Sequence, residues 1–260
     1  MAPLAGQHAI ITGGGRGIGA AIARNLAEVG ARVTIVSRTS IQLERKAAEL
    51  HRDTGAEVVA EPADVTVDDE VHRAFTAANV RFGPPTILVN NAGNARAAPF
   101  ARTTRALWDE MIAVNLTSTY LCIQEALVHM RPCGSGRIIN VASTASLRGY
   151  AYVAAYCAAK HGVVGLTRAL ALELASTSIT VNAVCPGYTD TPMLDEAARN
   201  IANQTGCTEA EAKQRLASNN PQKRLVEPAE VAAAVGWLCS EQARSVTGIA
   251  LPICGGEPMA

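Results

Sequence analysis

Three residues in the middle of the chain have side chains suited to acid–base chemistry: Ser143, Tyr156 and Lys160. Tyr156 and Lys160 are four positions apart, so on a helix they share one face. An ammonium group beside a phenol stabilises the phenolate, and the spacing therefore predicts that Lys160 lowers the pKa of Tyr156 toward neutrality. Such a tyrosine can donate and accept a proton at ordinary pH. An exposed surface pair is the alternative interpretation.

A glycine-rich turn, Thr12-Gly13-Gly14-Gly15-Arg16-Gly17-Ile18-Gly19, lies far upstream of these residues. It follows an apolar run and precedes an amphipathic one. Glycines allow a tight turn and a close approach of backbone to a pyrophosphate, which the N-terminus of the following helix attracts. The strand–turn–helix context favours nucleotide binding over an ordinary tight turn.

Short β-rich runs alternate with longer helical patterns. The predicted strands are His8–Thr12, Arg32–Val36, Glu57–Ala60, Thr86–Val89, Arg137–Val141, Ile179–Val184 and Gly248–Pro252. The predicted helices are Gly19–Val29, Ile41–Thr54, Asp68–Phe82, a long Thr104–Met130 and Tyr152–Ala175. This order predicts an α/β fold: a single doubly wound, Rossmann-type parallel sheet of about seven strands with helices on both faces.

Four candidate sites fall where predicted strands end: the glycine turn, Asn90–Gly93, Ser143 and Pro186-Gly187. Ligands of open parallel sheets bind beyond the carboxyl ends of the strands. The shared edge therefore predicts a single ligand site built from all four segments.

The composition limits the class of protein. The chain has 260 residues with 23 basic and 23 acidic side chains, and no linker or repeat divides it, so one domain spanning 1–260 is expected. Zero net charge does not favour nucleic acid or an anionic membrane as a partner. The N-terminus lacks a signal-peptide pattern, and no apolar stretch is expected to span a bilayer. Seven scattered cysteines without metal-ligand spacing indicate reduced thiols in a cytoplasmic protein without a metal.

The ordered set of motifs resembles the short-chain dehydrogenase/reductase family over essentially the whole chain. It comprises Thr12–Gly19, Asp64, Asn90–Gly93, Asn115, Ser143, Tyr156, Lys160 and Pro186–Thr191. By this resemblance, Tyr156 is the general acid/base of a hydride transfer between a nicotinamide and a carbonyl carbon. Lys160 supports Tyr156 and holds the nicotinamide ribose, and Ser143 binds the substrate oxygen. Asn115 disturbs its helix and holds a water that links the lysine to solvent.

The cofactor is expected to be NADP(H) rather than NAD(H). An acidic residue after the second strand would hold the ribose hydroxyls of NAD, but Ser37 and Arg38 stand there, and Arg16 lies in the glycine turn. Guanidinium groups suit the 2′-phosphate of NADP, although solvated surface arginines are the alternative. The resemblance completes the predicted cofactor site with Gly13, Gly17, Ile18, Ser37, Asp64, Val65, Asn91, Gly93, Tyr156, Lys160, Pro186 and Thr189.

The segment from about 188 to 224 is the least regular part of the sequence, apart from a capping box at Thr208 and Glu211 that predicts a short helix. In the family it is a mobile lid over the substrate, with Met193 and Leu194 as apolar contacts. Arg148, Tyr150 and Tyr152 are expected to border the substrate, although a solvent-facing Arg148 is the favoured interpretation of that residue.

The substrate is expected to be a 3-oxoacyl-type or cyclic ketone. The stretches Asn182–Gly187 and Lys160–Gly165 resemble aromatic-polyketide ketoreductases, and the wider pattern resembles 3-oxoacyl reductases and 3-hydroxyacyl dehydrogenases. The positions at which carrier-dependent relatives carry basic residues fall near Gly134 and Thr177, so a substrate bound to a carrier protein is not favoured.

Three other functions are alternatives to this one. An NAD-dependent alcohol or 3-hydroxyacyl dehydrogenase uses the same residues in the oxidative direction. A non-catalytic dinucleotide-binding regulator would be expected to lack the tyrosine or the lysine. A Rossmann-like methyltransferase would require an acid after the second strand, where Ser37 stands. Family members form dimers or tetramers, and a homotetramer is expected.

Overall fold

The computed structural model of the protein describes residues 2–257. Seven strands form one parallel sheet in the order β3-β2-β1-β4-β5-β6-β7. The strands are β1 (His8–Thr12), β2 (Arg32–Ser37), β3 (Val58–Pro62), β4 (Ile87–Asn90), β5 (Ser135–Val141), β6 (Ser178–Pro186) and β7 (Ala250–Ile253). The predicted doubly wound α/β fold is confirmed, with strand ends that differ from the predicted ones by up to two residues.

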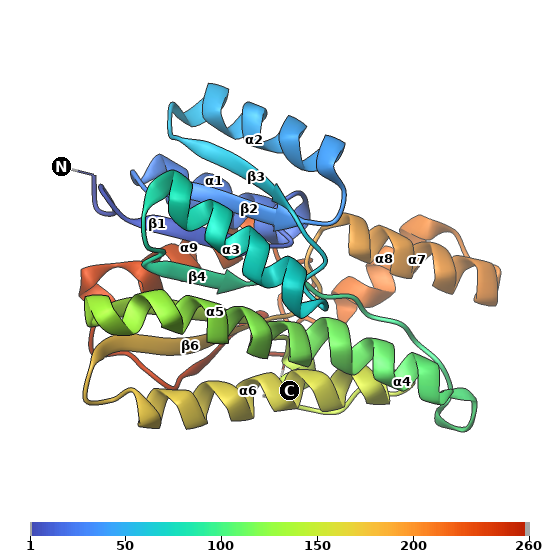
Figure 1. Cartoon of the computed structure of the whole chain (residues 1–260). Helices are drawn as coiled ribbons and strands as arrows, with labels where there is room; N and C mark the ends of the chain where they lie inside the picture. Colours follow the sequence, from blue (N-terminus) through green and yellow to red (C-terminus); the bar gives the residue numbers. More distant parts are fainter. Residues whose placement is uncertain (1, 258–260) are drawn as a thin grey trace.

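Helices cover both faces of the sheet (Figure 1). On one face α1 (Gly17–Glu28), α2 (Ser40–Thr54) and α9 (Pro228–Cys239) contribute to one apolar core. On the other face α3 (Asp68–Phe82), α5 (Ser118–Cys133) and α6 (Ala154–Glu173) contribute to a second core. Side chains of a strand alternate between the two faces, so Ile11 belongs to the first core and its neighbour Ile10 to the second.

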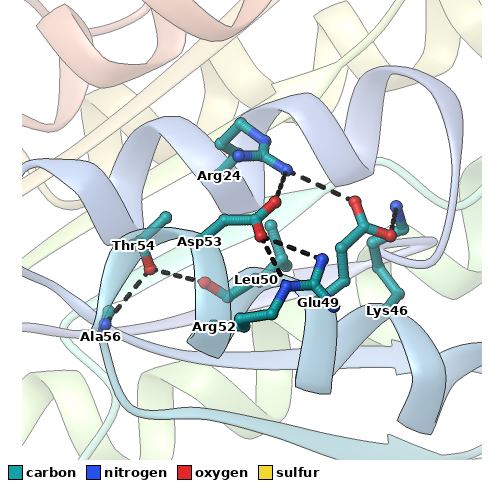
Figure 2. A network of polar contacts seen from close by, with 8 residues as sticks. All are labelled: Arg24, Lys46, Glu49, Leu50, Arg52, Asp53, Thr54 and Ala56. Atoms are coloured by element: carbon teal, nitrogen blue, oxygen red, sulfur yellow. Dashed lines mark hydrogen bonds and ion pairs between the residues drawn. The ribbon is translucent and has the colours of Figure 1, made fainter.

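An ion-pair network joins the first two helices (Figure 2). Arg24 of α1 donates to Asp53 at 2.8 Å and to Glu49 at 3.3 Å, both on α2. Lys46 lies 2.6 Å from the other oxygen of Glu49. Because α1 begins at the glycine turn and α2 begins just after Arg38, this network orients two elements that border the candidate cofactor site.

The long helix predicted from Thr104 to Met130 is interrupted. It consists of α4 (Arg105–Ile112), a π-helical turn over Ala113–Thr117, and α5, which continues to Cys133. No stretch was predicted to be long and apolar enough to span a bilayer, and that prediction is wrong. The helical unit Arg105–Cys133 has the length and the composition to do so, because its most apolar 18 residues have a mean hydropathy of 1.3. Its packing accounts for that composition, since Cys122, Ile123 and Met130 are buried against the sheet.

Two helices were not predicted, and both begin with proline. The segment from 188 to 224 is more regular than expected: α7 (Pro192–Thr205) precedes α8 (Glu209–Ser218), the latter capped by Thr208 as predicted. A threonine cap followed by proline was the overlooked signal for α7. Helix α9 begins at Pro228 in the same way. The other helices differ mainly at their first residues: α1 begins at Gly17, before the predicted Gly19, and α6 at Ala154, after Tyr152.

Candidate functional site

A cavity of about 660 Å³ lies at the carboxyl ends of the strands. It brings together most of the predicted site residues, which come from segments far apart in the sequence. The predicted residues that line it are Gly13, Arg16, Gly17, Ile18, Ser37, Arg38, Asp64, Val65, Asn91, Gly93, Asn115, Tyr156 and Lys160. Ser143, Pro186 and Thr189 are predicted site residues that do not line the cavity.

The glycine turn has the geometry that a bound phosphate group requires. Gly13 and Gly17 have φ angles of 64° and 54°, in the left-handed region that glycine tolerates best. Helix α1 begins at Gly17, and no side chain caps its first turn. Backbone N–H groups at an uncapped helix N-terminus bind anions. The turn therefore fits the pyrophosphate of a dinucleotide.

The ends of β1 and β4 are locked together by Thr12 and Asn91. The Thr12 hydroxyl oxygen accepts hydrogen bonds from the backbone N–H groups of Asn91 and Ala92, each at 3.0 Å. The Asn91 amide donates in return to the carbonyl oxygens of Thr12 at 3.0 Å and of Gly13 at 3.2 Å. These bonds hold the glycine turn against the Asn90–Gly93 segment.

One end of the cavity carries the residues expected to select the cofactor. Ser37 ends β2, and Arg38 and Arg16 are both exposed at the cavity. Asp64 accepts hydrogen bonds from the Thr66 N–H at 2.9 Å and the Thr66 hydroxyl at 2.7 Å. Burial alone would raise the pKa of Asp64, but these two bonds and the nearby Arg38 lower it. Thr39, Gln42 and Thr66 also line this end and were not predicted.

The π-helical turn places Asn115 inside the fold. Asn115 is fully buried; its amide nitrogen donates to Asn94 O at 2.9 Å and to Met111 O at 3.0 Å, and its oxygen accepts from Asn94 N at 3.2 Å. The expected disturbance of this helix at Asn115 is confirmed. A Cβ atom on Gly93 would lie 2.8 Å from Asn115 Oδ1 and 3.6 Å from Lys160 Nζ, so only glycine leaves this space open.

Lys160 is buried next to Tyr156. Its ammonium nitrogen donates to Val141 O at 2.8 Å and lies 5.8 Å from the centre of the Tyr156 ring. Burial lowers the pKa of Lys160 to about 8. Among the described residues no carboxylate forms an ion pair with Lys160 that would oppose this effect of burial.

The prediction that the pKa of Tyr156 is lowered toward neutrality is wrong, because its pKa is raised in this structure. Burial raises the pKa of Tyr156 to about 12, and the hydrogen bond with the Ser143 hydroxyl only partly opposes that effect. Desolvation of the phenolate outweighs the lysine, which points its donor at Val141 O. Tyr156 is therefore a neutral phenol that can donate a proton to a carbonyl oxygen.

Ser143 reaches the site through Tyr156 rather than from the cavity wall. Its hydroxyl lies close enough to Tyr156 to lower the pKa of that phenol, and it accepts a hydrogen bond from the Ala145 N–H at 3.1 Å. Pro186 is the last residue of β6, and Thr189 is buried and paired with Val226. These last two residues shape the turn after β6.

Only some of the residues that were expected to contact the substrate line the cavity. Met193 lines the cavity, together with Thr191, Pro192 and Glu196 of the same segment, whereas Leu194 is buried within the fold. Arg148, Tyr150 and Tyr152 do not line the cavity. Arg148 instead donates to Glu257 O at 2.9 Å, and Tyr152 is exposed with a φ angle of 69°. Sequence reasoning missed Glu196 and Glu110, which carry no motif.

A doubly wound parallel sheet with a cavity at the carboxyl ends of its strands, lined by the glycine turn, a tyrosine and a buried lysine, is typical of a Rossmann-type oxidoreductase. A family model described as enoyl-(acyl carrier protein) reductase matches residues 13–257. The chain is 43% identical over 250 residues to "Granaticin polyketide synthase putative ketoacyl reductase 1" of Streptomyces violaceoruber, covering 95% of this chain and 92% of the relative.

Two further proteins, both reductases, are similar to this chain over almost its whole length. Levodione reductase of Leifsonia aquatica is 38% identical over 253 residues, covering 96% of this chain and 94% of that one. A crystal structure of an actinorhodin polyketide ketoreductase variant with NADPH superposes with a TM-score of 0.94 at 39% identity, covering 98% of each chain. The protein belongs to the short-chain dehydrogenase/reductase family, and it is an oxidoreductase that acts on CH–OH or C=O groups.

Proposed function

We propose that this enzyme reduces a ketone with NADPH and that Tyr156 donates the proton. One observation carries the proposal: the cavity that Tyr156 and Lys160 line also contains Arg16 and Arg38 at its other end. When bound, the nicotinamide supplies the hydride, and the chain's own residues orient the carbonyl and protonate its oxygen. Ser143 bonds to Tyr156 and keeps its proton directed toward the substrate.

The relatives support a 3-oxoacyl-type or cyclic ketone as the substrate. They include a ketoacyl reductase, a levodione reductase and a cis-4-hydroxycyclohexanecarboxylate dehydrogenase of Sinomonas cyclohexanicum. A free substrate is favoured over a carrier-bound one because the arginines nearest the expected carrier positions are already paired. Arg131 lies 2.6 Å from Glu173, and Arg137 lies 3.4 Å from Glu241.

Arg38→Ala is expected to weaken NADPH binding at least about tenfold more than NADH binding, since a charge-assisted bond contributes roughly 1.5–3 kcal/mol. The 2′-phosphate distinguishes the two cofactors, and Arg38 is exposed at the cavity. Fluorescence titration of the purified protein with each cofactor measures the effect. Arg45→Ala, which removes an exposed arginine of α2 outside the cavity, is the control and should change neither affinity.

Equal losses of NADPH and NADH affinity in Arg38→Ala would show that Arg38 does not bind the 2′-phosphate. Tighter NADH than NADPH binding by the unmodified protein would instead support the oxidative alternative. Two relatives, of Rhizobium meliloti and Cupriavidus necator, are D-beta-hydroxybutyrate dehydrogenases, at 36% and 39% identity. The first substrates tried would then be hydroxyacyl compounds and secondary alcohols.

We propose that residues 188–224 act as a lid over the substrate. Helices α7 and α8 extend beyond the carboxyl ends of the strands, outside both helical layers (Figure 1). Lys213 of α8 lies 2.5 Å from Asp195 of α7, so the two helices are joined and would move together. Amide exchange in α7 is expected to slow when NADPH is added, and unchanged exchange would contradict the proposal.

We also propose a cytoplasmic homotetramer. Large apolar side chains are exposed on three helices: Val128 of α5, Leu172 of α6 and Trp237 of α9. Burying such side chains between copies is favourable. Light scattering should give four times the 27.1 kDa chain mass; a monomer would contradict the proposal. The seven cysteines are free thiols, which supports the cytoplasmic location.

A further inference from the structure

The chain segment that follows β7 lies at the carboxyl-end edge of the parallel sheet and carries a buried acid. Glu257 is the last residue that the structure describes, yet only 1% of it is exposed. A buried carboxylate is costly unless other groups bind it. The neighbours of Glu257 therefore indicate what its burial achieves.

The first set of neighbours is the turn that follows β5. Glu257 Oε1 lies 2.5 Å from the Tyr150 hydroxyl, which lies 2.8 Å from Thr144 Oγ1. Thr144 directly follows Ser143 in the sequence. Arg148 adds a bond to the Glu257 backbone oxygen at 2.9 Å and places its guanidinium 5.2 Å from the centre of the Tyr150 ring. Glu257 therefore contacts Arg148 and Tyr150 near the end of this turn directly, and it is linked through the Tyr150 hydroxyl to Thr144 near the start of the turn.

The second neighbour is the turn that follows β6. A side chain at Gly187 would begin 3.1 Å from Glu257 Oε2, so the carboxylate packs directly against this backbone. Oε2 is buried and has no hydrogen-bond partner among the described residues. Tyr188, the next residue, packs edge-on against Tyr150 with the ring centres 6.4 Å apart. One acid thus contacts the turns at the ends of two adjacent strands.

We infer that Glu257 is a positioning residue: through Tyr150 it fixes the turn that carries Ser143, and through Gly187 it fixes the turn after β6. This inference rests on the proposed function, because Ser143 acts on Tyr156. The hydrogen bond from Ser143 lowers the pKa of Tyr156 against the effect of burial. Loosening the turn should therefore weaken proton transfer while leaving the distant cofactor contacts unchanged.

Four single variants, and the double variant that combines Glu257→Leu with Tyr150→Phe, separate this role from general packing. Glu257→Leu removes the acceptor, and Tyr150→Phe removes only the phenol oxygen. Glu257→Gln keeps an acceptor oxygen for Tyr150. Tyr120→Phe is the matched control, because Tyr120 is exposed on α5. Each variant is assayed for thermal unfolding, NADPH affinity, kcat and KM, and amide exchange over residues 143–150.

Glu257→Leu and Tyr150→Phe are each expected to lower kcat about tenfold and to leave the affinity for NADPH unchanged. The tenfold effect corresponds to the loss of one hydrogen bond to a charged group. The double variant should lose no more than the larger single loss, because both act through one contact. Glu257→Gln should retain most of the activity, and Tyr120→Phe all of it. In alcohol oxidation, the increase of kcat with pH should shift to higher pH in the two damaging variants, because the phenolate of Tyr156 forms less readily.

Amide exchange over residues 143–150 needs no substrate, so it separates the two hypotheses. Faster exchange in Glu257→Leu and Tyr150→Phe supports the positioning role even if the unmodified enzyme reduces no ketone, a result that would overturn the proposed function alone. Unchanged exchange and unchanged kcat in both variants would overturn the positioning role. Additive losses of kcat in the double variant would also overturn it.

Discussion

Tyr156→Phe is expected to lower ketone reduction by about 100- to 10,000-fold, the range that general acid catalysis contributes. The phenol lines the cavity together with Lys160, and burial keeps it protonated, with a pKa of about 12. Phenylalanine retains the ring and its packing, so the affinity for NADPH should stay nearly unchanged. Steady-state kinetics with NADPH and a panel of ketones, beside a cofactor titration, measures both quantities.

The control for this variant is Tyr120→Phe, which removes an exposed phenol outside the cavity and should leave turnover unchanged. Normal turnover in Tyr156→Phe would remove Tyr156 from the mechanism. A parallel loss of NADPH affinity would assign the tyrosine to cofactor binding instead of proton transfer.

Gly19→Ala is expected to weaken NADPH binding by about 10- to 100-fold, the equivalent of roughly 1–3 kcal/mol of overpacking. Gly19 lies in the first turns of α1 beneath the glycine turn. A Cβ atom there would overlap the carbonyl oxygen of Gly13 and the side-chain amide of Asn91. Because that amide also bonds to Thr12 and Gly13, one methyl group displaces both segments that form the phosphate end of the cavity.

Gly165→Ala provides the matched control, since Gly165 is also helical but a Cβ atom there meets nothing within 4 Å. This variant should bind NADPH normally and unfold at the same temperature or slightly higher, because alanine favours a helix. Comparing the thermal unfolding of the two variants shows whether Gly19→Ala is still folded. Normal NADPH affinity in a folded Gly19→Ala protein would show that the turn does not hold the cofactor.

Local patterns were sufficient for most of the architecture. Alternating apolar runs and amphipathic helices, with Gly30 and the Gly83-Pro84-Pro85 stop between them, predicted seven strands and five helices before residue 176, the fourth of which is divided into α4 and α5 in the structure. Of the helices after residue 190, α8 was predicted from its capping box, whereas α7 and α9 were not. Helix α7 has an amphipathic pattern and a threonine cap followed by proline, and both signals were overlooked. Helix α9 is apolar on most of its surface, so its periodicity is weak and its proline start was the remaining signal.

The order of the motifs determined the class of site, because a parallel sheet brings successive strand ends to one edge whatever lies between them. The sequence by itself therefore assigned the glycine turn, Asn90–Gly93, Ser143 and Pro186-Gly187 to one edge of the sheet, and the resemblance to the family added Asn115, Tyr156 and Lys160. Only the tertiary structure decided the protonation of Tyr156, because burial depends on every element packed around the phenol. It also decided the place of Glu257, which lies 107 positions from Tyr150 in the chain and 2.5 Å from its hydroxyl. No local pattern encodes a contact that distant; it arises because the parallel strands β5 and β7 end at the same edge of the sheet.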